Sequence, residues 1–272
     1  MDNKYFYHHH PLFELLVPEK IIYEQPLNER IRTFLRLEFL FIRIDHALKQ
    51  NNELNNRNAI DGLLSILSVF ERSDLKQEIA KELERLVSTL SALENSPGVD
   101  QLALDDLLNE LDQILDALHM SRATISQTLR ENDFLYSIRQ RASIAGGSCD
   151  FDLPAYHFWL QHTPDKARNQ QLLNWLNHFA SLRAAIEISL KLIRGSTGFI
   201  NATADAGFFQ QNLNSGLANQ LIRVRVMNDI AYYPEISGGK HRFTVRLMHF
   251  DIEQRAKQVT EDIDFSLSIC AM

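Results

Sequence analysis

The feature that most constrains the fold is a change in the spacing of apolar residues near residue 195. From Pro26 to about Arg194, apolar side chains recur at every third or fourth position, which is typical of amphipathic helices. After the linker-like residues 195–198, apolar and polar side chains alternate, which is typical of half-buried strands. The chain is therefore predicted to be an α+β protein, with a helical domain followed by a small antiparallel β-sheet domain.

Capping and breaking residues divide the helical part. Asn28 and Asp100 are expected to cap helices, and the Pro97-Gly98 pair separates two of them. The expected helices cover residues 28–50, 59–70, 75–93, a segment that follows residue 100, 125–141, a helix that begins at Pro154, and one long helix over 165–194. The segment 148–153 is a candidate for an additional strand of the sheet.

Three segments alternate clearly enough to be predicted as strands. They cover residues 221–227, 241–250 and 262–269, with the hydrophobic side chains of each on one face. The predicted division of the chain is an N-terminal extension over 1–22 that is expected to be poorly ordered, a mainly helical domain over 23–198, and a β-rich domain over 199–272.

Charge and cysteine content limit the classes of protein to which this chain is expected to belong. The 272 residues carry a formal net charge of −7, whereas a nucleic-acid-binding domain is usually basic. The two cysteines are typical of a protein of the reducing cytoplasm. No apolar run approaches the about 20 residues that a membrane helix needs, and the N-terminus lacks the pattern of a secretory signal. A cytoplasmic protein without a membrane partner is expected.

The sequence lacks the motifs of common enzymes. It contains no Walker-type phosphate loop, no dinucleotide-binding glycine pattern, no Gly-x-Ser-x-Gly elbow and no His-Glu-x-x-His zinc motif. His157 and His162 are five positions apart, so a helix would place them on different faces. Cys149 follows a glycine pair, but a buried structural cysteine is favoured over a nucleophile. No catalytic residue, metal or cofactor is predicted, and a hydrolase built on Cys149 is the least favoured hypothesis.

Basic residues gather in two of the predicted strands. They are Arg223 and Arg225 on one strand, and Lys240, Arg242 and Arg246 on the other. If the two strands pair, their alternation places four guanidinium groups on one exposed face, where planar forks suit the carboxylates of an acidic peptide. The competing interpretation is that Asp262 and Asp264 neutralise these arginines across the sheet, although two carboxylates cannot satisfy four arginines and a lysine. A nucleic-acid-binding face is the alternative function for the same residues.

Several separated motifs resemble those of one family, in the same order along the chain. They are YEQPLNERIRT at 23–33, VFER at 69–72, PGVDQ at 97–101, RQR at 139–141, FDLP at 151–154 with His157 and Trp159, and YPEISG at 233–238. From Tyr23 to Cys270, nearly the whole chain is similar to ZapD, a family of bacterial cell division factors. The segment 1–22 precedes the usual start of the family.

The resemblance implies a fold, a partner and an activity. Members of the ZapD family have a helical domain and a β-rich domain, and they form symmetric homodimers. They bind the C-terminal tail of FtsZ, the tubulin-like division protein, and crosslink its filaments into bundles at the division site at mid-cell. They are not enzymes and need no cofactor.

The resemblance also implies roles for individual residues. Binding of the FtsZ tail is expected of Arg72, Arg242 and Arg246, to which the basic strands add Lys240 and Arg225. Bundling of filaments is expected of Arg36 and His157.

Overall fold

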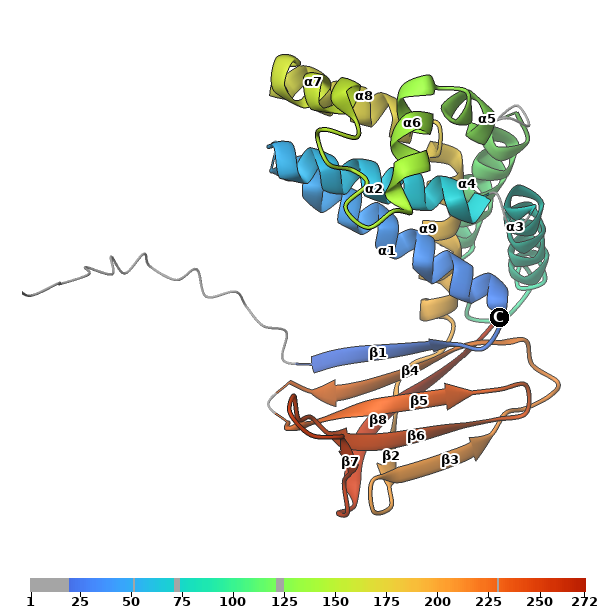
Figure 1. The fold of residues 1–272 in the computed structure, drawn as a ribbon. Helices are drawn as coiled ribbons and strands as arrows, with labels where there is room; N and C mark the ends of the chain where they lie inside the picture. Colours follow the sequence, from blue (N-terminus) through green and yellow to red (C-terminus); the bar gives the residue numbers. More distant parts are fainter. Residues whose placement is uncertain (1–19, 51, 71–73, 121–124, 229) are drawn as a thin grey trace, which may run out of the picture. The chain divides into compact units, whose positions relative to one another are not determined.

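The computed structural model describes residues 20–50, 52–70, 74–120, 125–228 and 230–272, and it separates into two compact units (Figure 1). The helical unit comprises Asn28–Gly195. The β unit comprises Ser196–Ala271 together with the described residues that precede Asn28. The α+β class that was predicted from the spacing of apolar residues is confirmed.

Capping side chains fix where helices of the helical unit begin. The helices are α1 (Glu29–Lys49), α2 (Glu53–Phe70), α3 (Leu75–Ser91), α4 (Gln101–Met120), α5 (Ile125–Arg130), α6 (Asp133–Ala142), α7 (Pro154–His162), α8 (Asp165–Asn177) and α9 (Ala180–Gly195). Asn28 caps α1, because its Oδ1 accepts the backbone N–H of Ile31 at 2.9 Å. Asp100 accepts the N–H of Ala103 at 3.2 Å at the start of α4. Both predicted caps are confirmed.

Helix α1 illustrates how the apolar spacing builds the helical core. Its buried side chains recur at intervals of three and four residues, and they are Ile31, Phe34, Leu37, Phe41, Ile44 and Ala47. This stripe packs against α2 and α9. The backbone of α2 lies close to α1, because a Cβ on Gly62 would lie 2.5 Å from Cγ1 of Ile44.

Three of the predicted helices are wrong in their extent: α2 begins at Glu53 rather than at residue 59, and two others are divided. The helix predicted over 125–141 is two helices, α5 and α6, because Asn132 caps α6 and accepts the N–H of Leu135 at 3.0 Å. The single long helix predicted over 165–194 is also two helices, α8 and α9, with a turn at His178 and Phe179 between them. The apolar spacing continues across both breaks, so periodicity alone does not reveal them.

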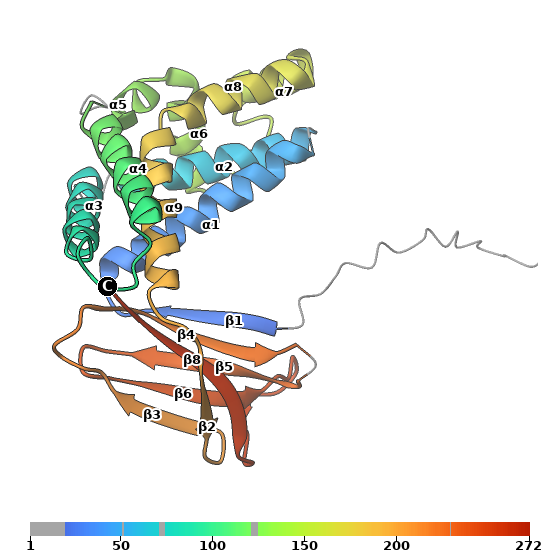
Figure 2. The ribbon, with the colours of Figure 1, turned by 180° about the vertical axis from the view of Figure 1, so that it is seen from behind.

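The β unit consists of two four-stranded sheets (Figures 1 and 2). Its strands are β1 (Lys20–Pro26), β2 (Ile200–Ala204), β3 (Phe208–Asn212), β4 (Asn219–Met227), β5 (Tyr232–Gly238), β6 (Arg242–His249), β7 (Lys257–Gln258) and β8 (Ile263–Ala271). The first sheet has the order β1-β4-β8-β2, and the second has the order β3-β6-β5, with the short β7 also paired to β6. The pairings are antiparallel.

The core of the β unit joins side chains of both sheets. It includes Ile222, Val224 and Val226 of β4, Phe243, Val245 and Leu247 of β6, and Phe265 and Leu267 of β8. These are the alternating residues that were predicted to share a buried face, so this prediction is confirmed. The side chains between them, including Arg225, Arg242 and Arg246, therefore lie on the outer faces of the two sheets.

The boundaries of the two units differ from the predicted ones. Lys20–Pro26 pair with β4 and belong to the β unit, although the sequence placed residues 20–22 in the extension and 23–26 in the helical domain. The segment 148–153 is a series of turns in the helical unit, not a strand, and the N–H of Leu153 donates to the carbonyl oxygen of Cys149 at 3.2 Å. The N-terminal extension was predicted to be poorly ordered, and its residues 1–19 lie outside the described residues.

Candidate functional site

The outer face of the second sheet carries two exposed arginines. Arg242 and Arg246 lie on β6, on the face opposite the buried Phe243 and Val245. They are four residues apart, which corresponds to about 13 Å along a strand. Thr244 lies between them on the same face. We call this surface, with its neighbours on β3 and β5, the arginine face.

The strands beside β6 complete the arginine face. The register places Phe208 of β3 and Glu235 of β5 on either side of Arg246. Phe208 is 37% exposed and supplies an apolar wall. Tyr233 of β5 lies beside Met248, one step further along the same face. The face therefore combines cationic groups with an aromatic surface.

The cations of the arginine face are available to a partner. Among the described residues, Arg242, Arg246 and Lys240 form no ion pair or hydrogen bond through their side chains, and all three are exposed. Glu235 accepts a hydrogen bond from the hydroxyl of Tyr233 at 3.4 Å. Guanidinium groups without an internal carboxylate are suited to bidentate binding of an external one.

The predicted face of four arginines is wrong. β4 pairs with β1 and β8 in the first sheet, whereas β6 lies in the second sheet, so Arg223 and Arg225 lie on a different face from Arg242 and Arg246. The chain changes sheets between β4 and β5. Lys240 and the two arginines of β6 remain together, but Arg225 does not join them.

The arginines of β4 are held by local contacts. Arg223 Nε lies 2.9 Å from Glu24 Oε1 of β1, and its guanidinium carbon is 5.1 Å from the centre of the Phe199 ring. Arg225 lies closer to the same ring, at 4.3 Å, and its Nη2 donates to Ser266 Oγ at 3.3 Å. The aromatic ring therefore fixes the position of both guanidinium groups.

The proposed neutralisation by the last strand is wrong for the arginine face. Asp262 accepts the N–H of Ala206 at 2.8 Å, and Asp264 accepts the hydroxyl of Thr203 at 2.7 Å. β8 belongs to the first sheet, so its carboxylates do not lie opposite β6. This competing interpretation therefore does not remove the positive charge of the arginine face.

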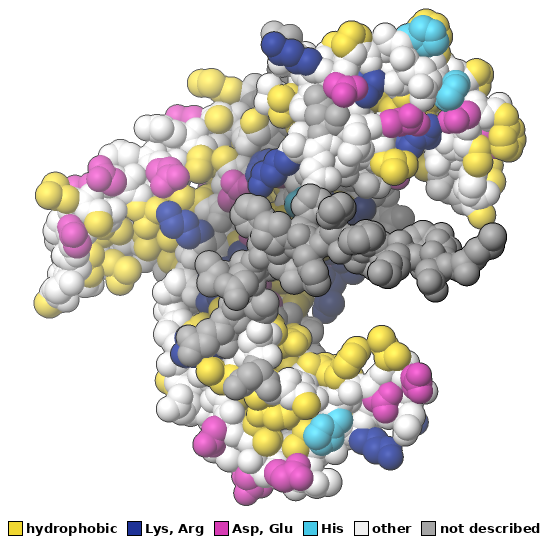
Figure 3. Space-filling model, turned by 90° about the vertical axis from the view of Figure 1, so that its left-hand side faces the viewer, with side chains coloured by type: hydrophobic (Ala, Val, Ile, Leu, Met, Phe, Trp, Pro, Cys, Tyr) yellow, Lys and Arg dark blue, Asp and Glu magenta, His cyan; other side chains and the backbone are white. Residues whose placement is uncertain are grey.

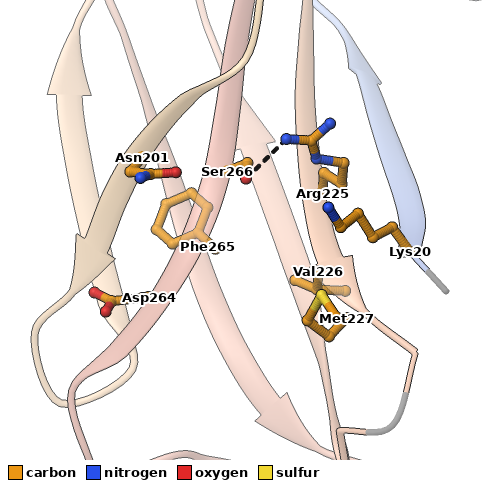
Figure 4. Close-up of a pocket in the computed structure, with 8 residues that line it drawn as sticks. All are labelled: Lys20, Asn201, Arg225, Val226, Met227, Asp264, Phe265 and Ser266. Atoms are coloured by element: carbon orange, nitrogen blue, oxygen red, sulfur yellow. Dashed lines mark hydrogen bonds between the residues drawn. The ribbon is translucent and has the colours of Figure 1, made fainter.

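A pocket of about 280 Å³ lies beside Arg225 on the first sheet (Figure 4). Figure 4 shows Lys20 of β1 and Arg225 of β4 on one side of it and Asp264 of β8 on the other. Lys20 was not predicted as a site residue. Its place in the pocket follows from the pairing of Lys20 in β1 with Met227 in β4, and this register has to be known before Lys20 can be identified.

The residues expected to bundle filaments lie on different helices of the helical unit. Arg36 is exposed on α1, with Nη1 3.6 Å from Glu29 Oε1. His157 on α7 has Nδ1 3.1 Å from Asp150 Oδ2, and Asp150 also binds Arg57 at 2.7 Å. The hydrogen bond from Arg57 holds the pKa of Asp150 below its ordinary value. Arg72, expected to bind the tail, lies outside the described residues.

Among the described residues, the cysteines and histidines are not grouped into a metal site. Cys149 is exposed, so the prediction that it is buried is wrong. Cys270 is the buried cysteine, and burial raises the pKa of its thiol. His162 stacks on Phe158 with ring centres 4.0 Å apart. Within the described ranges, no group of three or more His, Cys, Asp or Glu side chains is placed to hold a metal ion.

Among the helices of the described segments, none combines the length and the apolar composition that crossing a bilayer requires.

Comparison with known proteins assigns the chain to a family. The model of the ZapD cell division protein family matches residues 35–246. The cell division protein ZapD of Methylococcus capsulatus is 39% identical over 253 residues, which cover 93% of this chain and 99% of that protein. ZapD proteins of Cupriavidus pinatubonensis and Ralstonia nicotianae are 41% and 42% identical, with 92% of this chain and 99% of each relative covered. The chain belongs to the ZapD family of cell division proteins.

Proposed function

We propose that this protein is a non-enzymatic adaptor that binds the C-terminal tail of FtsZ and crosslinks FtsZ filaments into bundles. The observation that carries the proposal is the pair of exposed arginines, Arg242 and Arg246, which have no internal ion-pair partner among the described residues. The protein would act in the cytoplasm, at the division site at mid-cell. Membership of the ZapD family supports the role in cell division.

The chemistry of the arginine face suits an acidic peptide that also carries apolar side chains. Arg242 and Arg246 would bind carboxylates through charge-assisted hydrogen bonds. Phe208 beside Arg246 and Tyr233 at the end of the face would contact apolar groups of the same peptide. Lys240 adds positive charge next to Arg242, and Arg72 is proposed to take part in tail binding as well.

Crosslinking requires more than one tail-binding site on each assembly. A homodimer would present two arginine faces, so two tails from different filaments are held at once and weak single contacts combine into stable bundling. Arg36 and His157 are proposed to make the additional filament contacts of the helical unit. The geometry of β4 gives Arg225 no place in the arginine face.

A nucleic-acid interface is the alternative use of the same arginines. The flanking Glu235 carboxylate and the formal net charge of −7 both disfavour a polyanionic partner. A peptide needs only a few carboxylates at defined positions, which two arginines and a lysine can match. The acidic peptide is therefore the better partner for this surface.

Sedimentation of FtsZ filaments tests the adaptor function. The double substitution Arg242→Glu and Arg246→Glu reverses both cations of the arginine face and should reduce co-sedimentation of the protein with filaments at least about tenfold. Both side chains are exposed, so the thermal unfolding temperature should stay within a few degrees of the wild type.

The matched control is Lys81→Glu with Lys166→Glu, which changes the net charge equally on exposed positions of α3 and α8. This control should bundle filaments as the wild type does. If the arginine variant bundles filaments normally, or if the control loses bundling to the same extent, the arginine face is not the binding site for the FtsZ tail.

A further inference from the structure

An apolar groove lies at one edge of the β unit, where β1 of the first sheet and β5 of the second contact each other. It has a volume of about 700 Å³ and is lined mainly by Ile21, Tyr23, Met227, Ile230, Tyr232 and Phe250. Ile21, Tyr23, Ile230 and Tyr232 are only partly buried against the core. Within the described residues, both β1 and β5 are edge strands, so each leaves one backbone edge without a paired strand.

The rim of the groove exposes large apolar side chains. Phe250 is 69% exposed and Met227 is 40% exposed. Figure 3 shows hydrophobic side chains gathered on the β unit in the face that it presents. Clustered apolar side chains at a concave surface are typical of a binding site, whereas singly exposed ones are not.

The groove is continuous with the cationic pocket of the first sheet. Val226 and Met227 line both of them. Beyond Met227, the pocket presents Lys20 and Arg225 (Figure 4). Lys20 forms no ion pair with another described residue, and Arg225 Nε is buried without a hydrogen-bond partner among them. Phe199 and Ser266 hold the guanidinium in place.

The carboxylates that line the two cavities are already engaged. Asp264 accepts the hydroxyl of Thr203, and Asp251 accepts the backbone N–H groups of Glu253 and Gln254 at 2.8 and 3.1 Å. Both cations, Lys20 and Arg225, line the pocket, whereas the only charged side chain of the described residues that lines the groove is Asp251. The surface is therefore apolar along the groove and cationic in the pocket.

We propose that this composite surface binds an acidic peptide, with an apolar side chain in the groove and a carboxylate against Lys20 and Arg225. Charge complementarity in the pocket and apolar complementarity in the groove together select such a peptide. The inference rests on the proposed function, because we identify the peptide with the FtsZ tail. Tyr233 lines the groove and also ends the arginine face, so the two surfaces adjoin at this side chain.

A double-mutant cycle between the protein and a labelled FtsZ tail peptide tests this inference by fluorescence anisotropy. The groove variant carries Met227→Ala and Phe250→Ala, and its affinity should fall about tenfold. A peptide with its apolar residues changed to alanine should bind the wild-type protein as weakly as the native peptide binds the groove variant. The affinity of this changed peptide should fall little further when it is measured with the groove variant. Lys20→Ala should weaken the native peptide, but not one whose carboxylates are changed to amides.

Neighbouring exposed residues provide the controls. Ile252→Ala removes an apolar side chain that is 85% exposed and does not line the groove, and Lys257→Ala removes an exposed cation of β7. Neither control should change the affinity. If the groove variant and Lys20→Ala bind the peptide like their controls while Arg242→Glu with Arg246→Glu abolishes binding, this inference is wrong and the proposed function stands.

Two further outcomes of these measurements lead to different conclusions. If the wild type does not bind the peptide, the proposed function fails and this inference fails with it. If the groove variant keeps its peptide affinity but changes from dimer to monomer in light scattering, the groove is an interface between two copies of the chain and not a peptide site.

Discussion

Arg223 and Arg242 occupy equivalent places in the alternating pattern of their strands, yet different neighbours surround them. Arg223 binds Glu24, a residue 199 positions away in the sequence, and lies against Phe199. Arg242 is exposed on the arginine face and has no ion pair within the described part of the chain. Alternation predicts that both face outward, but only the pairing of strands decides which arginine is available to a partner.

Gly207 is the residue whose backbone most restricts substitution in the β unit. Its φ is +72°, and a Cβ would lie against the carbonyl oxygen of Val259 at a distance that real side chains do not adopt. Gly207→Ala should therefore lower the free energy of unfolding by at least about 2 kcal/mol, through backbone strain together with the steric clash. Urea denaturation monitored by circular dichroism measures the change.

Two other glycines separate strain from steric clash. Gly98 has φ +85° with no atom within 4 Å of a new Cβ, so Gly98→Ala should cost about 1 kcal/mol from strain alone. Gly198 has neither feature, and Gly198→Ala should change stability by less than about 1 kcal/mol. Equal stability of all three variants would contradict this explanation.

The strands that the sequence predicted are the ones with neighbours on both sides. β4, β6 and β8 are interior strands, and burial on one face gives each of them a regular alternation. β1 and β5 are edge strands with weaker patterns. β1 carries Ile22, 42% exposed, on its outer face, and β5 contains Pro234, which an edge strand tolerates because the missing N–H is not needed for pairing.

The start of α1 depends on a side-chain cap that the sequence predicted correctly. Asn28→Ala removes the hydrogen bond to the N–H of Ile31 and should lower the free energy of unfolding by about 1 kcal/mol. Asn28→Ser keeps an oxygen acceptor at this position and should preserve most of the stability. Chemical denaturation of the two variants under the same conditions gives the comparison, and an Asn28→Ala variant as stable as the wild type would show that the cap contributes nothing.

For the whole molecule, the sequence predicts the class of fold and the family better than the geometry of the site. The change of apolar spacing near residue 195 is local information, and it was sufficient for the α+β class. The arginine face depends on β6 lying between β3 and β5, and the groove depends on β1 reaching β5. These long-range contacts explain why the face of four arginines was wrong and why Lys20 and the groove were missed.

Binding of a single tail and bundling of filaments are proposed to depend on different residues. The arginine face and the groove belong to the β unit, whereas Arg36 and His157 belong to the helical unit. On this account, substitutions in the β unit reduce binding of a single tail. Substitutions at Arg36 and His157 leave tail binding intact and reduce only the bundling of filaments.

Binding of the FtsZ tail through exposed cations is the proposal on which the other proposals depend. Its most direct test is the anisotropy of a labelled tail peptide, titrated with the wild-type protein at low and at high salt, beside a labelled DNA duplex. We predict binding of the peptide in about the micromolar range that weakens several-fold at high salt, and no binding of the DNA. Absence of peptide binding at both salt concentrations, or binding of DNA with a steep salt dependence, would show that the exposed cations do not form a site for the FtsZ tail.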